Sequence, residues 1–152
     1  MEICVNKDGV VFEDLITINE DSVKTEELEY PLTHALVVAK SEKGFLLMYN
    51  SWKNHWEVPG GLIEQGETMR KCAEREMLEE TNQIAEKMEF KGLMKFKFKN
   101  NKTEYGGLFS AYIREERQFI NNEEAKKIIF WNGTDDIGYI DEIDKKLLEY
   151  YQ

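Results

Sequence analysis

The chain has 152 residues, of which 41% are hydrophobic and 12% aromatic, a composition that predicts one globular domain and excludes wholesale disorder. The formal net charge of −10 counts against tight, sequence-independent binding to nucleic-acid phosphates or to anionic membranes. The apolar runs are too short to cross a bilayer, no secretion signal begins the chain, and Cys4 and Cys72 are isolated, so we expect a cytoplasmic protein without a membrane span.

The first part of the chain predicts a hairpin followed by an acidic connector. Residues 1–15 hold two short apolar runs around the polar turn Asn6-Lys7-Asp8-Gly9. Residues 13–30 are rich in acids with Lys24 as the one base, which is typical of a solvated connector, and a short helix over residues 23–28 is the alternative. We therefore divide a single domain, residues 1–152, into this N-terminal segment (1–30) and a core (31–152).

The core alternates strand patterns with two helix patterns. Small, β-branched and aromatic runs predict strands at residues 33–40, 45–49, 91–99, 105–113 and 128–131. Residues 50–59 read as an aromatic loop in which Trp56 packs into the core. A helix begins after the N-cap Thr68, and an amphipathic helix closes the chain at residues 141–150. This order predicts an α/β protein in which helices cover a mixed sheet.

Three glutamates at helical spacing are the strongest chemical signal. Glu76, Glu79 and Glu80 stand at i, i+3 and i+4, so their carboxylates share one helix face within about one turn. On its own, such a run is more often a solvated helix face. Beside an apolar stripe, however, mutually repelling carboxylates call for a multivalent cation, and clustered oxygen ligands favour Mg²⁺ or Mn²⁺.

The context of these glutamates resembles the signature of the Nudix hydrolases. The pattern is Gly-x5-Glu-x7-Arg-Glu-aliphatic-x-Glu-Glu, and residues 56–61 before it are also typical of that family. The matching positions are Gly61, Glu67, Arg75, Glu76, Met77, Glu79 and Glu80. The resemblance implies a Nudix-type α/β/α sandwich with a central mixed β-sheet, and metal-dependent cleavage of a nucleoside diphosphate linked to another group.

The same resemblance implies roles for the matched residues. Glu79 and Glu80 would bind metal, and the carbonyl oxygen of Gly61 would complete part of the coordination. Glu76 would bind metal or act as the general base, which agrees with the way metals and carboxylates activate water.

The rest of the signature implies a structural pair and contains two departures. Arg75 and Glu67 would hold the motif together by an ion pair. Asn82 replaces the family's glycine, and Gln83 its final aliphatic residue. Asparagine tolerates the left-handed conformation that ends a helix, so we expect the backbone to be kept, and Ile84 is a candidate for the apolar position.

Residues outside the signature complete the predicted site. The family often takes another metal ligand from a later loop, where Glu123 and Glu124 lie, although a solvated pair explains them equally well. Trp52, His55 and Tyr105 are candidates for binding a base at the rim of the pocket.

The predicted activity is hydrolysis of (d)NTPs, including oxidised ones such as 8-oxo-dGTP, to NMP and pyrophosphate. ADP-ribose-cleaving relatives typically carry a proline after the motif, and this chain has prolines only at Pro31 and Pro59. The rival within the family is a dinucleoside polyphosphate or RNA 5′-end pyrophosphohydrolase. Two further classes are a nucleotide-binding module on the same scaffold and an interaction domain that uses its acidic segment. We expect a small-molecule nucleotide as partner, neither a membrane nor a long nucleic acid, and a monomer or homodimer.

Overall fold

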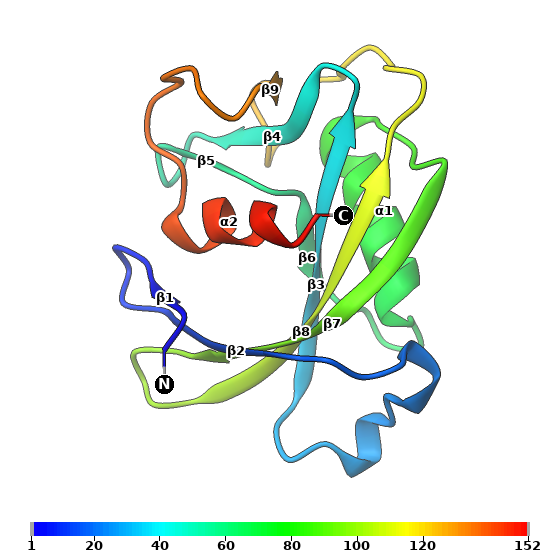
Figure 1. Ribbon diagram of the computed structural model, residues 1–152, viewed down its shortest axis with the longest axis vertical. Helices are drawn as coiled ribbons and strands as arrows, with labels where there is room; N and C mark the ends of the chain where they lie inside the picture. Colours follow the sequence, from blue (N-terminus) through cyan, green and yellow to red (C-terminus); the bar gives the residue numbers. More distant parts are fainter. Residues whose placement is uncertain (1, 152) are drawn as a thin grey trace.

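The structure, a computed structural model, describes residues 2–151 and contains one sheet with helices on both sides (Figure 1). The strands are β1 (Cys4–Val5), β2 (Val11–Ile16), β3 (Leu32–Ser41), β4 (Gly44–Asn50), β5 (His55–Glu57), β6 (Gly60–Leu62), β7 (Lys87–Lys97), β8 (Thr103–Tyr112) and β9 (Ile128–Trp131). The α-helices are α1 (Met69–Thr81) and α2 (Glu142–Leu147), and 3₁₀ turns lie at Glu20–Ser22, Thr25–Glu27 and Leu148–Tyr150. Within residues 2–151, every helix is too short or too polar to cross a lipid bilayer.

The sheet is mixed, as predicted, and β3 is its hub. Its order is β1-β2-β7-β8-β3-β4-β5, with β6 also paired to β3 and β9 to β4. The pairing of β3 with β8 is parallel, while β4 and β6 pair with β3 antiparallel. The small and β-branched residues of β3 are buried on both faces of the sheet, because a core of apolar side chains packs against each face.

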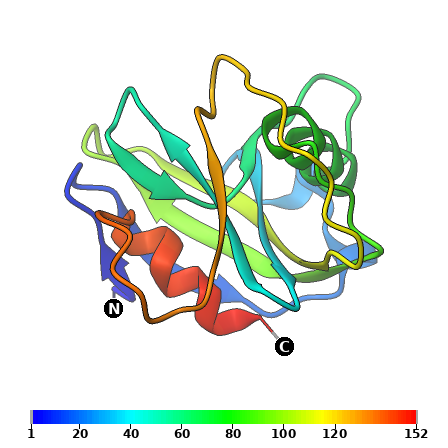
Figure 2. The ribbon, with the colours of Figure 1, turned by 90° about the horizontal axis from the view of Figure 1, so that it is seen from above.

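Alternation along β3 divides the interior into two cores. Ala35 and Val37 face the first core with the apolar side of α1, while Val38 faces the second core, which α2 covers. Figure 2 shows α1 and α2 on opposite sides of the sheet. The predicted α/β/α sandwich is therefore confirmed, and its two layers of side chains hold the signature helix against the middle of the sheet.

The N-terminal hairpin is confirmed, but the acidic connector begins later than predicted. β1 pairs with β2, and β2 continues to Ile16 because Leu15 and Ile16 pair with Met94 and Leu93 of β7. Residues 13–16 are therefore strand. The remaining connector contains two 3₁₀ turns, one of them at Thr25–Glu27, inside the window where a short helix was the alternative.

The aromatic loop at residues 50–59 is partly strand, which corrects the sequence expectation. His55–Glu57 forms β5 and pairs with the end of β4. Trp56 is buried, as predicted, and its Nε1–H donates to the carbonyl oxygen of Ile137 at 2.7 Å. The buried tryptophan thus holds this segment in the sheet.

The closing helix is confirmed as α2 followed by a 3₁₀ turn. The side chain of Asp141 caps α2 by accepting from the N–H groups of Ile143 and Asp144 at 2.9 and 3.1 Å. Ile143 and Leu147 then face the second core.

Candidate active site

Helix α1 presents two of the three signature glutamates to the sheet. Thr68 caps its start by accepting from the Lys71 N–H at 3.1 Å. Asn82 ends it with φ 60° and ψ 20°, the left-handed conformation that the sequence predicted for this asparagine. Met77 packs into the core, and this fixes the rotation of the helix so that Glu76 and Glu80 are buried beside it.

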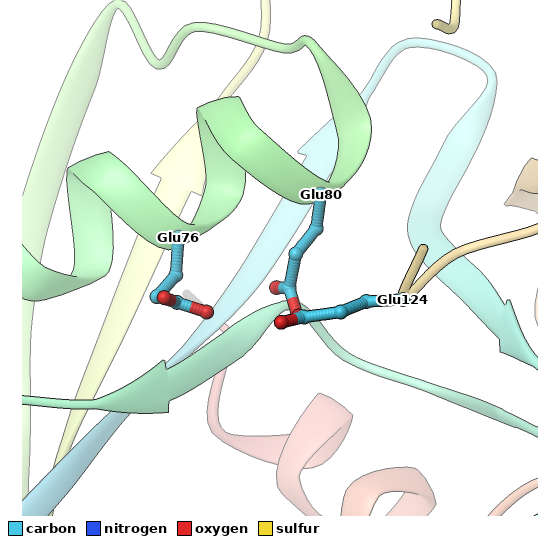
Figure 3. A group of neighbouring side chains, drawn as sticks. All are labelled: Glu76, Glu80 and Glu124. Carbon is cyan, nitrogen blue, oxygen red and sulfur yellow. The ribbon is translucent and has the colours of Figure 1, made fainter. Parts of the chain in front are cut away.

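Glu76 and Glu80 meet a third carboxylate, that of Glu124. One oxygen from each side chain lies within 4.8 Å of the others, and Figure 3 shows the three converging from α1 and from the loop before β9. Glu80 is 4% exposed and accepts from the Gly60 N–H at 2.9 Å. Of the two loop glutamates left open by the sequence, the structure therefore brings Glu124 to the cluster.

The electrostatics of this cluster fit a hard cation. Burial, followed by the hydrogen bond with Glu124, raises the pKa of Glu80 to about 10. Burial also raises the pKa of Glu76, against the lowering effect of Arg75. Oxygen ligands of high negative charge are those that Mg²⁺ and Mn²⁺ prefer, so these three side chains fit the metal that the signature implies.

Glu79 lies apart from the cluster, which corrects the expectation that all three carboxylates share one face. Its side chain is 57% exposed, and an oxygen lies 3.3 Å from Nη1 of Arg75. At 3.6 residues per turn, Glu80 lies about 40° from Glu76 toward the buried stripe, whereas Glu79 lies about 60° away on the other side. A metal-binding role for Glu79 stays a prediction of the resemblance.

The strand before the helix makes close contact with Glu76. Gly61 lies in β6 opposite Ala35 of β3, and a Cβ on Gly61 would overlap Oε2 of Glu76. Its carbonyl oxygen accepts from the Cys72 thiol at 3.4 Å. A side chain at position 61 would displace the Glu76 carboxylate from its present position, and metal coordination by the Gly61 carbonyl stays a prediction.

The predicted ion pair between Arg75 and Glu67 is present. Nε and Nη2 of Arg75 donate to the two oxygens of Glu67 at 2.7 and 2.9 Å, a bidentate geometry. Nη2 also reaches the Leu62 carbonyl at 3.0 Å, and Nη1 reaches Oε1 of Glu76 at 2.5 Å. The hydrogen bond with Arg75 holds the pKa of Glu67 at about 2. Arg75 therefore ties the loop before α1 to the carboxylate cluster.

Of the three residues predicted to bind a base at the rim of the pocket, His55 and Tyr105 are buried and only Trp52 is exposed. His55 is 2% exposed, with Nε2 at 2.8 Å from Oε1 of Glu57, and Tyr105 is buried where β8 meets β3 and β7. His55 begins β5 and Tyr105 lies near the start of β8, and the burial of both side chains was not shown by sequence periodicity. Trp52 is 85% exposed, so it is free to stack on a ligand, and that role stays a prediction.

A cavity of about 410 Å³ lies on the α2 side of β3 and β6, and none of its residues was among the predicted site residues. Its apolar and aromatic lining comprises Val10, Leu36, Leu62, Phe96, Phe98 and Ile143. Its polar lining comprises Asn6, Thr33, His34, Lys53, Glu104, Asp141 and Asp144. The alternation Lys95-Phe96-Lys97-Phe98 in the sequence is the pattern that could have indicated a shared face for the two phenylalanines.

Hydrogen bonds orient two polar side chains of the cavity, His34 and Asp144. Burial lowers the pKa of His34 to about 4, so its ring is neutral at pH 7. Thr33 Oγ1 donates to Glu104 at 2.7 Å and lies 2.9 Å from Nδ1 of His34, so Nδ1 carries the ring proton and Nε2 is an acceptor. Asp144 accepts from the Val58 N–H at 3.0 Å, and burial, then Asp141 and Glu57, raise its pKa well above the ordinary value.

Comparisons with known proteins identify the family and the fold. The family model of the NUDIX domain matches residues 30–151. The Bacillus subtilis pyrophosphohydrolase BsRppH, solved as a mutant, is 17% identical with a TM-score of 0.76, covering 99% of this chain and 95% of that one. The MutT protein from Methanosarcina mazei Go1 is 21% identical with a TM-score of 0.54, covering 70% and 81%.

The NUDIX domain of Shewanella oneidensis NrtR, solved with ADP ribose, is 15% identical with a TM-score of 0.66, covering 86% of this chain and 92% of that one. At these identities the solved structures support the fold, and the match of the domain model over most of the chain supports the family. The chain therefore belongs to the Nudix family of hydrolases.

Proposed function

We propose that this protein is a divalent-metal-dependent pyrophosphohydrolase that cleaves nucleoside triphosphates, including oxidised ones such as 8-oxo-dGTP, to NMP and pyrophosphate. The observation that carries the proposal is the convergence of Glu76, Glu80 and Glu124 beside the backbone of Gly60 and Gly61. A triphosphate and an acidic protein repel each other, so a cation between them is needed for binding.

Glu80 and Glu124 would hold Mg²⁺ or Mn²⁺, with Glu76 at the edge of the same group. Such an ion polarises a phosphoryl oxygen and makes a bound water more acidic. Oε1 of Glu76 is held by Arg75, and Oε2 makes no hydrogen bond within residues 2–151, so Oε2 is the oxygen we assign to take the proton of the attacking water. Water adds to phosphorus, the proton passes to Glu76, and the bond to the leaving phosphate oxygen breaks.

The cavity on the other face of β3 is the proposed place for the nucleobase. Its volume of about 410 Å³ is in the range of small-molecule sites. Phe96 and Phe98 offer flat apolar surfaces, and Asp144 and His34 offer acceptors to the N–H groups of a base. Guanine presents two neighbouring donors on one edge, so we propose guanine nucleotides as the preferred substrates.

One observation favours a longer substrate as the second candidate. Trp52 is 85% exposed, and the next residue, Lys53, lines the cavity. An aromatic side chain outside the base cavity offers a second stacking surface, as a dinucleoside polyphosphate or an RNA 5′ end would use. The net charge of −10 argues against long RNA.

We also propose a cytoplasmic location, because Cys4 and Cys72 are free thiols, as a reducing compartment permits.

A substrate screen tests the proposed reaction. The protein is incubated with (d)NTPs, 8-oxo-dGTP, a dinucleoside tetraphosphate and 5′-triphosphorylated RNA, each with Mg²⁺, Mn²⁺ or EDTA, and pyrophosphate and phosphate release are followed. We expect metal-dependent pyrophosphate release, fastest with guanine nucleotides. Tight nucleotide binding without turnover would support the binding-module alternative, and faster cleavage of RNA ends than of any free nucleotide would support the second candidate.

Asp144→Asn is expected to weaken the preference for guanine. The asparagine oxygen keeps the hydrogen bond with the Val58 N–H, but an amide replaces the second acceptor. A bidentate contact to a base is worth about 1–3 kcal/mol, so kcat/KM for GTP relative to UTP should fall by roughly 5- to 150-fold. The matched control is Asp135→Asn, which changes an exposed acid. An unchanged GTP-to-UTP ratio would contradict the base site.

A further inference from the structure

The loop that carries Glu124 has no helix or strand of its own. Residues 113–127 connect β8 to β9 without regular structure, and most of their side chains are exposed. A free loop of this length samples many conformations, so the placement of one carboxylate at a metal site needs other contacts. The structure supplies those contacts from the end of α1.

Gln83 makes the most buried of these contacts. Its side chain is 0% exposed, Nε2 donates to the Arg117 carbonyl at 2.6 Å, and Oε1 accepts from the Arg117 N–H at 2.9 Å. The amide thus pairs with both backbone groups of one loop residue. An aliphatic side chain at this position would leave those two groups without these partners. Ile84, the sequence candidate for the apolar position, is instead 52% exposed.

Two further amides join the same elements. Asn82 Nδ2 donates to the Gln118 carbonyl at 2.8 Å. Asn122 Nδ2 donates to the Glu80 carbonyl at 2.9 Å, and its Oδ1 accepts from the Glu124 N–H at 3.0 Å. Asn122 therefore connects the backbone of one cluster glutamate directly to that of the other.

We infer that Asn82, Gln83 and Asn122 form an amide clamp that positions Glu124 for metal binding. Two of its members, Asn82 and Gln83, are the positions at which this chain departs from the Nudix signature. The departures therefore have a function specific to this chain: the end of the signature helix holds the loop that completes the site. The inference rests on the proposed function, because it takes Glu124 to be a metal ligand.

Mn²⁺ binding to the purified protein tests the clamp without reference to turnover. Gln83→Met replaces the amide with an unbranched apolar side chain of similar length, and we expect Mn²⁺ affinity, measured by titration calorimetry, to fall about tenfold. Gln118→Met is the matched control, since the Gln118 side chain is exposed and only its backbone contacts the clamp. Hydrogen exchange of residues 113–127 should become faster in Gln83→Met and stay unchanged in the control.

A double-mutant cycle with Glu124→Gln separates the two hypotheses. Glu124→Gln alone should weaken Mn²⁺ binding, and adding Gln83→Met should then have little further effect. If Glu124→Gln binds Mn²⁺ like the wild type, the proposed metal site is wrong. If Glu124→Gln weakens binding but Gln83→Met does not, or does so equally in both backgrounds, only the clamp is wrong.

A second variant covers the case in which Gln83→Met does not fold. Asn82→Gly keeps a residue suited to the left-handed helix end and removes only the contacts with the loop. We expect it to weaken Mn²⁺ binding about threefold. Wild-type affinity in Asn82→Gly, with wild-type exchange of residues 113–127, would overturn the inference.

Discussion

Glu80→Gln is expected to lower kcat by about 10²- to 10⁴-fold while leaving the protein folded. Glutamine has the same shape, and its oxygen can still accept from the Gly60 N–H, but it removes a negative charge from the centre of the carboxylate cluster. The metal would lose a ligand at the point where the three side chains meet.

The same substitution should not destabilise the metal-free protein. Burial and Glu124 already raise the pKa of Glu80 to about 10, so a neutral side chain at this position matches the form that the folded protein favours. Thermal melting in EDTA measures this, and steady-state kinetics with saturating Mg²⁺ measures turnover. Glu74→Gln, an exposed acid on the same helix, is the control. Turnover near the wild-type value in Glu80→Gln would rule out the proposed metal centre.

Arg75→Met is expected to reduce both activity and stability, by about 100-fold in kcat/KM and by several degrees in the midpoint of thermal unfolding at pH 7. Arg75 joins Glu67, the Leu62 carbonyl and Glu76. Without it, the loop before α1 loses its attachment to the helix, and two partly buried carboxylates lose their cation.

Arg75→Met should also change the pH dependence of the free energy of unfolding. The folded-state pKa of Glu67 is about 2, below its ordinary value of 4.5, so its contribution to stability is present above the ordinary pKa and is lost as pH falls through the folded-state value. The wild type should therefore lose stability between about pH 5 and pH 2 more steeply than Arg75→Met. Melting curves across this range measure the difference, with the exposed Arg114→Met as control. Parallel curves for wild type and Arg75→Met would show that the pair does not carry this dependence.

The sequence by itself determined the features that depend on neighbours along the chain. The period of 3.6 residues placed Glu76 and Glu80 on one side of α1, and Asn82 was recognised as a left-handed helix end. The resemblance to the Nudix signature implied the Glu67–Arg75 pair. The small and β-branched run at residues 33–40 likewise predicted a strand, and a continuous run of this kind suits burial on both faces, as the structure shows.

Only the tertiary structure decided the features that join distant segments. Glu124 reaches Glu80 across the fold, and Asp144 reaches Val58 from the other end of the chain. No local periodicity encodes such contacts, because they depend on how the loop before β9 and helix α2 pack against the sheet. For the same reason Gln83 appeared as a mismatch in the signature, whereas its buried hydrogen bonds with Arg117 show why an amide is suited to that position.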